Sequence, residues 1–178
     1  DSIFLDDVQK MYPIIKQLEQ EEWGDYCNLE RGGPSITTHP RGSFFDKLPD
    51  TISVPFLQKL EYCLDDYAMK FGEPGLVITN NWFNIQYECS ALGEHTHPGS
   101  IVSGALYVNV DERSSNLRFK NINPYAHLSE HTNETNYNCF YEEFEPQNGT
   151  LILFPSWLPH DSLPNKSKER VVISFNTS

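Results

Sequence analysis

The sequence predicts an α+β fold that is mainly β, in which two helices precede a jelly roll or β-sandwich. Two observations predict this order. Apolar residues recur at helical spacing in the first 72 residues, with acidic and amide side chains between them. From Gly75 onward, short runs of β-branched and aromatic residues alternate with turn residues. About seven such runs within about 100 residues are typical of a jelly roll or a sandwich.

The first helix is expected near the N-terminus of a helical support that spans residues 1–72. Apolar side chains recur at helical spacing from Ile3 to Leu18. Pro13 interrupts this pattern, because proline cannot donate a backbone hydrogen bond inside a helix. We therefore expect either a kink or two short helical pieces.

The second helix is expected to begin near Ser53, with Pro55 in its first turn, and to end at Gly72. The segment 24–49, which separates the two helices, is rich in glycine and proline. It is long for an unstructured loop. We therefore expect part of it to form a strand or a lid.

A β-rich core is expected over residues 75–178, and with the helical support it forms a single domain, 1–178. Turn residues separate the candidate strands. These strands are 76–79, 82–87, 101–110, 116–119, 139–144, 150–154 and 171–175.

Charge and composition restrict the partners of the chain. The formal net charge is −12, and the basic residues form no cluster, which excludes nucleic acid as a direct partner. No apolar run is long enough to span a membrane, and no signal peptide is visible. The 4 cysteines are widely scattered, so we interpret them as free thiols. We therefore expect a cytoplasmic protein whose partner is a small-molecule or peptide substrate; the oligomeric state stays open.

Three histidines are candidates for a metal site. His95 and His97 are separated by one residue at the start of an expected strand, so their side chains share a face. His160 follows another expected strand, 150–154, after a proline-rich turn. Three imidazoles on a β scaffold leave coordination positions open, but they do not choose among iron, zinc, copper and nickel. The alternative is that all three are ordinary surface or hydrogen-bonded histidines.

Arg170 is a candidate for binding a carboxylate. On a strand, Arg170, Val172 and Ser174 share one face. An arginine inside a jelly roll needs a partner, because its guanidinium stays charged. A small molecule with a carboxylate could be that partner through a bidentate contact. An exposed arginine paired with a surface acid is the alternative.

Three ordered segments resemble a known family. "HTHPGSIVSGALYV", "GTLILFPSWLPH" and "RVVISFN" are similar to an uncharacterised family of 2-oxoglutarate/Fe(II) oxygenases of bacteria and marine phages, related to the prolyl hydroxylases. The resemblance covers roughly residues 82–176. It implies a double-stranded β-helix and an Fe(II)- and 2-oxoglutarate-dependent dioxygenase that hydroxylates an unidentified substrate, with a prolyl or other peptide side chain as one option. It also implies a bacterial cytoplasm, or the host cytoplasm for a phage protein.

The same resemblance implies roles for particular residues. Iron would be held by His95, His97 and His160. Arg170 would bind the far carboxylate of 2-oxoglutarate. Ser174 and Tyr87 would assist in binding this cosubstrate.

His97 departs from the pattern of the wider superfamily, which uses two histidines and one carboxylate. An imidazole in place of a carboxylate raises the net charge of the site by one unit. Glu94 and Asp161 flank the candidate ligands, and either could supply an oxygen instead. Adjacent residues on a strand face opposite ways, so we rank both carboxylates below His97.

The remaining histidines and two tryptophans have weaker support. His127 and His131 lie in the polar stretch 121–138, which we expect to be a long loop and a possible substrate lid. Trp82 and Trp157 are expected in the core or in a pocket wall.

Two alternative functions remain at this point. A cupin-like three-histidine metalloprotein would not use 2-oxoglutarate and would not need Arg170. A metal-free β-sandwich binding module would tolerate the loss of His95 and His160.

Overall fold

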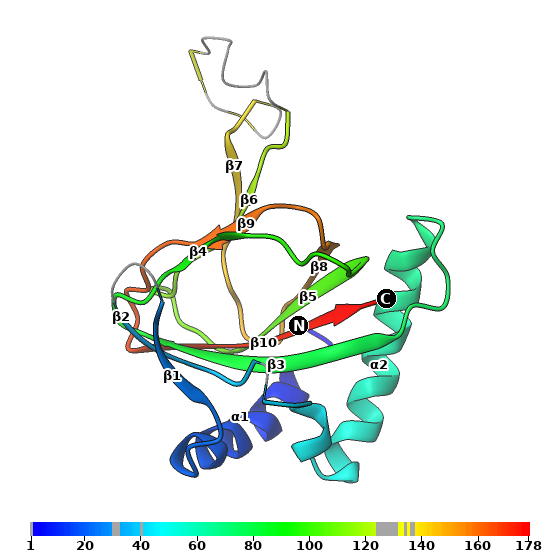
Figure 1. The fold of residues 1–178 in the computed structure, drawn as a ribbon, viewed down its shortest axis with the longest axis vertical. Coiled ribbons are helices and arrows are strands. Elements are labelled where there is room, and N and C mark those ends of the chain that lie inside the picture. The colour runs from blue at the N-terminus through cyan, green and yellow to red at the C-terminus, as the bar shows by residue number, and fades with distance from the viewer. Residues whose placement is uncertain (1, 30–32, 40, 124–131, 134, 136–137) are drawn as a thin grey trace.

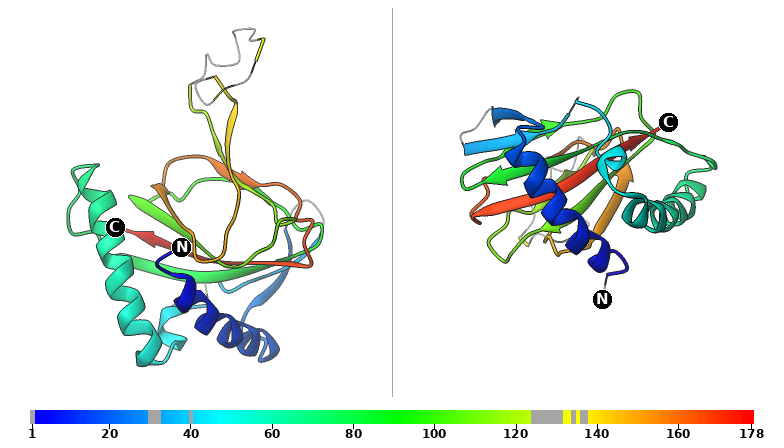
Figure 2. Two further views of the ribbon diagram at one scale, coloured as in Figure 1. Left: turned by 180° about the vertical axis from the view of Figure 1, so that it is seen from behind. Right: turned by 90° about the horizontal axis from the view of Figure 1, so that it is seen from below.

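The computed structural model describes residues 2–29, 33–39, 41–123, 132–133, 135 and 138–178. In this part of the chain two sheets face each other, and two helices cover the outer face of the larger sheet (Figures 1 and 2). The helices are α1 (Leu5–Gln20) and α2 (Asp50–Met69), with a short 3₁₀ helix at Phe45–Lys47. The expected α+β jelly roll preceded by helices is confirmed.

The larger sheet is antiparallel, with strand order β1-β2-β3-β10-β5-β8, and the smaller sheet has the order β4-β9-β6-β7. The strands of the larger sheet are β1 (Asp25–Leu29), β2 (Gly33–Thr37), β3 (Ile78–Tyr87), β5 (Val102–Asn109), β8 (Leu151–Pro155) and β10 (Glu169–Thr177). Those of the smaller sheet are β4 (Leu92–His95), β6 (Leu117–Lys120), β7 (Tyr141–Phe144) and β9 (His160–Ser162).

The expectation of two separate helical pieces around Pro13 is wrong. Helix α1 runs through Pro13 without a break. Proline removes one backbone hydrogen bond, but Val8, Met11 and Ile15 on the same helix are completely buried against the sheet. Burial of each such side chain contributes about 1.5–3 kcal/mol, which outweighs one lost hydrogen bond.

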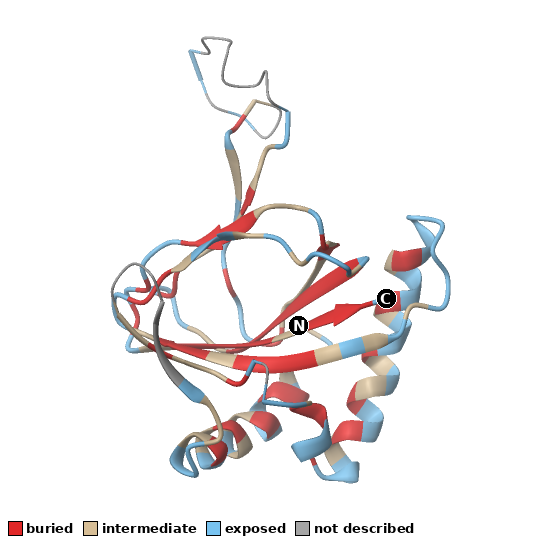
Figure 3. Cartoon of the chain, viewed as in Figure 1, coloured by how far each residue is buried: buried red, intermediate tan, exposed pale blue. Residues whose placement is uncertain are grey.

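Alternating side chains on β10 separate two cores. Val171, Ile173 and Phe175 pack with the helices in the larger core. Val172 faces the other way, into the space between the sheets, where it packs with Tyr107 and Phe154. The central strands are therefore buried on both faces. Figure 3 accordingly colours most of β5 and β10 as buried.

The hairpin of β6 and β7 projects beyond the body of the molecule (Figure 1). Its connection contains most of the expected loop 121–138, and His127 and His131 lie outside the described residues.

Two further expectations concern cysteines and membranes. Cys63 and Cys89 are free thiols, as expected. Neither α1 nor α2, the two long helices of the described chain, is long and apolar enough to cross a membrane.

Candidate metal centre and its pocket

A pocket of about 300 Å³ lies between the two sheets. The larger sheet forms one wall of the pocket, called the floor here, and the pairing of β3 with β10 gives the order of the residues along it. At one end Gln86 of β3 pairs with Arg170 of β10. Further along, Asn84 pairs with Val172, and then Trp82 pairs with Ser174. Because alternate residues of a strand share one face, these three pairs form three successive rows of the floor. Residues of all three rows line the pocket.

The smaller sheet forms the roof, and its register matches that of the floor. Leu92 pairs with Ser162, and the amide of Gln86 donates a hydrogen bond of 3.4 Å to the Ser162 hydroxyl. This part of the roof therefore lies above the Arg170 end. His95 pairs with His160 one step further along the roof. The histidines are consequently displaced from Arg170 along the pocket.

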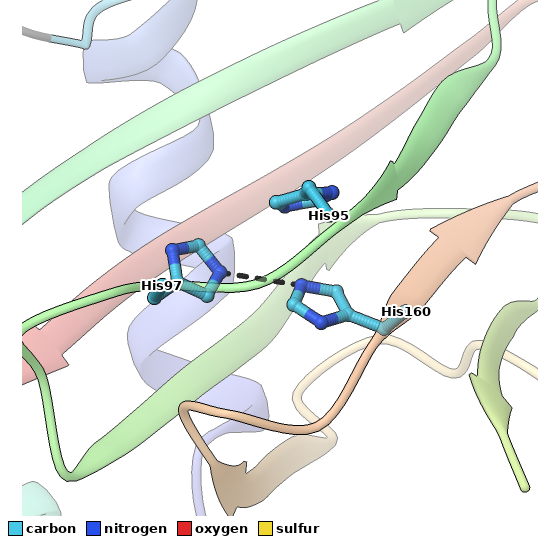
Figure 4. Close-up of side chains that lie close together, drawn as sticks. All are labelled: His95, His97 and His160. Atoms are coloured by element: carbon cyan, nitrogen blue, oxygen red, sulfur yellow. Dashed lines mark hydrogen bonds between the residues drawn. The ribbon is translucent and has the colours of Figure 1, made fainter. Parts of the chain in front are cut away.

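The three candidate histidines converge, although they come from three different segments. His95 ends β4, His97 lies in the loop that follows, and His160 begins β9. One ring nitrogen from each lies within 4.8 Å of the others. Figure 4 shows the rings facing a common point, with Nε2 of His97 3.2 Å from Nε2 of His160.

Backbone carbonyls fix the tautomers of two of these rings. Nδ1–H of His95 donates to the carbonyl of Gly93, and Nδ1–H of His160 donates to the carbonyl of Leu158, each at 2.9 Å. A carbonyl can only accept, so both protons must lie on Nδ1. In the neutral rings Nε2 then carries a free lone pair that is available to a metal ion.

Burial and the neighbouring histidines keep the rings of His97 and His160 neutral. Burial lowers the pKa of His97 to about 4, and the neighbouring His160 and His95 add to this effect. Burial likewise lowers the pKa of His160 to about 4. Both imidazoles are therefore unprotonated at neutral pH, which is the state that binds metals.

Arg170 is held at the closed end of the pocket, where it is only 4% exposed. Its Nε–H donates to the carbonyl of Ser115 at 3.1 Å, and its NH1 group donates to Oε1 of Gln86. Its NH2 group lies 3.5 Å from the hydroxyl of Tyr107. None of these partners carries a negative charge, and no ion pair of the described residues includes Arg170.

Comparison with known families identifies the chain. A family model described as "Putative 2OG-Fe(II) oxygenase" matches residues 80–176, more than half of the sequence. The chain belongs to this oxygenase family. Iron(II) and 2-oxoglutarate are accordingly the cofactors of this oxygenase. No curated protein sequence matches the chain.

Solved structures share the fold of the oxygenase. The Pseudomonas putida prolyl-4-hydroxylase is 15% identical with a TM-score of 0.62, and the match covers 99% of this chain and 89% of that one. A viral collagen prolyl hydroxylase from Paramecium bursaria Chlorella virus-1 is 12% identical, with a TM-score of 0.62 and coverage of 99% and 93%. HygX from Streptomyces hygroscopicus, solved with nickel and 2-oxoglutarate, is 11% identical, with a TM-score of 0.57 and coverage of 98% and 78%.

The donor set of the oxygenase fits a divalent transition metal. One ligand nitrogen of each of the three imidazoles lies within 4.8 Å of the others, and all three histidines line the pocket. Imidazole is a normal ligand of iron, zinc, copper and nickel. The site thus has the donors and the open positions that a catalytic metal needs.

The two carboxylates that flank the histidines point away from them in the oxygenase. Both carboxylate oxygens of Asp161 accept hydrogen bonds of 2.7 Å from Arg118. Glu94 accepts a hydrogen bond of 3.0 Å from Lys120 on the same outer face of the roof. Neither carboxylate belongs to the cluster of candidate metal ligands.

The two candidate helpers of Arg170 lie in different places. Ser174 lines the pocket but is two rows from Arg170, about 13 Å along the strand. Tyr87 lies on the opposite face of the larger sheet, packs against the helical core and donates its hydroxyl hydrogen to Glu19. The reason is strand parity: its neighbour Gln86 faces the pocket, so Tyr87 faces the helices.

Sequence reasoning missed several residues of the oxygenase pocket. Tyr107 is completely buried beside Arg170, and His39 lies at the exposed end of the pocket beside Trp82. Asn84 faces the centre of the pocket from β3. The polar residues of β3 alternate with Phe83 and Ile85, and this alternation is the signal that identifies the pocket face. Trp82 was expected in the core or a pocket wall, and it forms part of that wall.

Proposed function

We propose that this oxygenase is a dioxygenase that hydroxylates a C–H bond of its substrate, with iron bound by His95, His97 and His160. The observation that carries the proposal is the position of two sites in one pocket. Three convergent imidazoles lie towards one end, and the unpaired guanidinium of Arg170 lies at the other. A linear dicarboxylate that chelates iron at one end needs this arrangement.

Arg170 binds the far carboxylate of 2-oxoglutarate in this proposal. The guanidinium is buried without a countercharge, so a bound carboxylate supplies the missing negative charge. Its Nε–H is occupied by the Ser115 carbonyl, which fixes the direction of the planar group. Hydrogen bonds to a charged group of this kind contribute about 1.5–3 kcal/mol each.

Tyr107 takes the assisting role that the sequence suggested for Tyr87. Burial raises the pKa of Tyr107, so the hydroxyl stays protonated and can donate to the same carboxylate. Ser174 faces the metal end of the pocket, so its hydroxyl serves that end and not the far carboxylate. Tyr87 has no part in the proposed site.

The chain itself orients the reactants and excludes water. Bound iron supplies the oxidative chemistry, and the protein fixes its ligands and the cosubstrate. The carbonyls of Gly93 and Leu158 hold two imidazoles in the ligating tautomer. Leu117, Phe154 and Val172 line the pocket with apolar surface, which limits the access of water.

The substrate is proposed only as a class. Two of the similar structures are prolyl hydroxylases, and HygX has also been solved with hygromycin B. By this analogy we propose a peptide side chain, such as a prolyl group, or a small molecule as the substrate.

An anaerobic titration tests the proposal. Metal-free protein receives Fe(II) and then 2-oxoglutarate, and visible absorption reports the chelate of iron and 2-oxo acid. We expect an absorption band in the native protein, and a much weaker band at equal cosubstrate concentration in Arg170→Ala. Arg113→Ala is the matched control, because Arg113 is exposed and lies outside the pocket.

Two results would contradict the proposal. If iron binds but no absorption band forms, 2-oxoglutarate does not chelate the iron at this site. A band of undiminished strength in Arg170→Ala would remove Arg170 from its proposed role.

A further inference from the structure

Asn165 lies in the loop that joins β9 to β10, and it is only 1% exposed. The backbone of this residue is bonded in both directions. Its N–H donates to the carbonyl of Ser90 at 2.7 Å, and its carbonyl accepts the N–H of Cys89 at 2.8 Å. These two bonds attach the loop to the turn that follows β3 without using the Asn165 side chain.

The side-chain amide of Asn165 joins segments of the two sheets. Its Nδ2 group donates to the backbone carbonyl of Gln86 in β3 at 3.0 Å. Its Oδ1 accepts the backbone N–H of Ser115, shortly before β6, at 3.3 Å. The carbonyl can only accept and the N–H can only donate, so these partners allow a single orientation of the amide. One carboxamide therefore connects the larger sheet to the segment that leads into the smaller sheet.

The same two segments hold the guanidinium of Arg170. The carbonyl of Ser115 accepts its Nε–H at 3.1 Å, and Oε1 of Gln86 accepts from its NH1 group. Asn165 is thus bonded to both residues that fix the direction of this planar group. A guanidinium binds a carboxylate through two donors at once only when its plane is correctly oriented.

Ser115 depends on its backbone for its position. Its hydroxyl is buried and has no hydrogen-bond partner among the described residues. The bond from its N–H to Asn165 and the bond from Arg170 to its carbonyl are therefore the contacts that place it. Asn165 is itself fixed by Ser167, whose hydroxyl lies 2.9 Å from Oδ1 and whose carbonyl accepts from Nδ2 at 3.2 Å. A buried polar network whose members are paired in this way fixes one geometry.

We propose that Asn165 is a positioning residue for the cosubstrate. Its amide sets the separation of Ser115 and Gln86, and thereby the plane in which Arg170 meets the far carboxylate of 2-oxoglutarate. The inference rests on the proposed function, since it takes 2-oxoglutarate as the ligand of Arg170. Donors that are oriented in advance bind their ligand at a lower entropic cost. Without the amide, the guanidinium is free to turn and loses this advantage.

The first measurement uses nuclear magnetic resonance of the ¹⁵N-labelled full chain without cosubstrate. The Nε–H signal of Arg170 is assigned by its absence from Arg170→Lys, and its bond to Ser115 protects it from exchange with solvent. Arg118 is an internal reference, because its Nε–H donates to Asp161 at 2.7 Å. We expect Asn165→Ala to shift or broaden the Arg170 signal and to leave the Arg118 signal unchanged.

The second measurement is calorimetric titration of the zinc-loaded protein with 2-oxoglutarate. Asn165→Ala should weaken cosubstrate binding about threefold to tenfold, as expected for the loss of a neutral hydrogen bond. Its affinity for Zn(II) should stay unchanged, because Asn165 does not belong to the histidine cluster. In an Arg170→Lys background the same substitution should have less than about a twofold effect, since an ammonium group is a point charge without a planar fork.

Asn81→Ala is the matched control. Asn81 is also a buried asparagine, and its amide bonds Phe45 and Ser43 on the helical side of the larger sheet. This variant should lose stability and keep the native affinity for 2-oxoglutarate. Asn165→Ser retains a hydroxyl in the loop but is too short to connect both segments, so it replaces Asn165→Ala if the alanine variant does not fold.

Three results would overturn the inference. An unchanged Nε–H signal of Arg170 in the Asn165 variants would show that the amide does not hold the guanidinium. An equal loss of cosubstrate affinity in the Arg170→Lys background would mean a general structural effect, and so would an equal loss in Asn81→Ala. Failure of the proposed function is distinguishable: the native zinc-loaded protein would then bind no 2-oxoglutarate, while the Nε–H signal would still decide whether Asn165 orients Arg170.

Discussion

Arg170 of β10 and Gln86 of β3 face each other at the closed end of the pocket, and the guanidinium donates to an uncharged amide oxygen. Burial lowers the pKa of Arg170, but an arginine side chain remains charged in proteins. The ligand-free protein therefore carries a buried positive charge without a countercharge among the described residues. If Arg170 binds 2-oxoglutarate as proposed, the stability of the protein should depend on this cosubstrate.

Arg170→Met should separate stability from cosubstrate binding. Removing an unpaired buried charge should leave the ligand-free protein at least as stable as the native one. In the presence of Zn(II), 2-oxoglutarate at about 100 times its Kd should stabilise the native protein by about 2.7 kcal/mol and the variant hardly at all. Thermal unfolding with and without 2-oxoglutarate measures both effects. An equal shift of Tm in the two proteins would show that Arg170 does not bind this ligand.

Tyr107→Phe and Tyr87→Phe form a matched pair. Loss of the Tyr107 hydroxyl should weaken 2-oxoglutarate binding about tenfold to a hundredfold, because one hydrogen bond to a charged carboxylate is lost. Tyr87→Phe should leave the Kd unchanged, since its hydroxyl bonds Glu19 on the far side of the sheet. Calorimetric titration of the zinc-loaded proteins measures the two constants. A larger effect at Tyr87 would reverse our assignment.

Asp161→Asn tests the role of the carboxylate next to His160. Asp161 binds Arg118 through two hydrogen bonds of 2.7 Å, so the variant should lose about 1–3 kcal/mol of stability. Metal affinity should fall by no more than about tenfold, because the carboxylate supports the strand and does not touch the metal. Chemical unfolding and metal titration give the two values. Glu94→Gln is the control for a more exposed ion pair, and abolished metal binding in Asp161→Asn would make Asp161 a ligand.

Glu169 should make the stability of the fold depend on pH. Burial alone would raise the pKa of Glu169, but hydrogen bonds from Tyr12 and Lys16 outweigh it and hold the pKa below its usual value. The ionised form is thus favoured in the folded state. Its contribution is fully present above the unfolded pKa of about 4.3 and is lost as pH falls through the lower folded pKa.

Glu169→Gln checks this linkage through urea unfolding at several pH values. The variant should be less stable than the native protein at pH 7, by about 1–3 kcal/mol. The difference should shrink as the pH falls below about 4. A difference that is constant with pH would mean that the carboxylate packs without a specific charge interaction.

Local patterns predicted the larger sheet better than the smaller one. The alternation on β10 correctly placed Arg170, Val172 and Ser174 on one face. Strands β4 and β9 were not predicted, because they are short and polar and exist through their mutual pairing. Such pairing joins residues far apart in the sequence and leaves no local pattern. The alternation of side chains along β3 also explains the position of Tyr87. Phe83 and Ile85 lie in the core beside the helices, so Tyr87, two residues further along, faces the same side.

The convergence of the histidines was only partly predictable. The spacing of His95 and His97 indicated a shared face, but β4 ends at His95. His97 is held instead through its backbone N–H, which donates to the Ser156 carbonyl at 2.9 Å. That contact comes from a different loop, so the sequence alone could not predict it.

Adjacent residues of β10 join the two layers of the molecule. Tyr12 and Lys16 of α1 donate hydrogen bonds to the carboxylate of Glu169. The side chain of the next residue, Arg170, lines the pocket. Helix α1 therefore holds the start of β10 on one face of the sheet, and the guanidinium of Arg170 extends into the pocket on the other face. For protein engineering, this means that a minimal enzyme cannot be obtained by trimming α1 from the barrel. Such a truncated chain would lose the contacts that hold Glu169, next to Arg170, before any residue of the pocket had been altered.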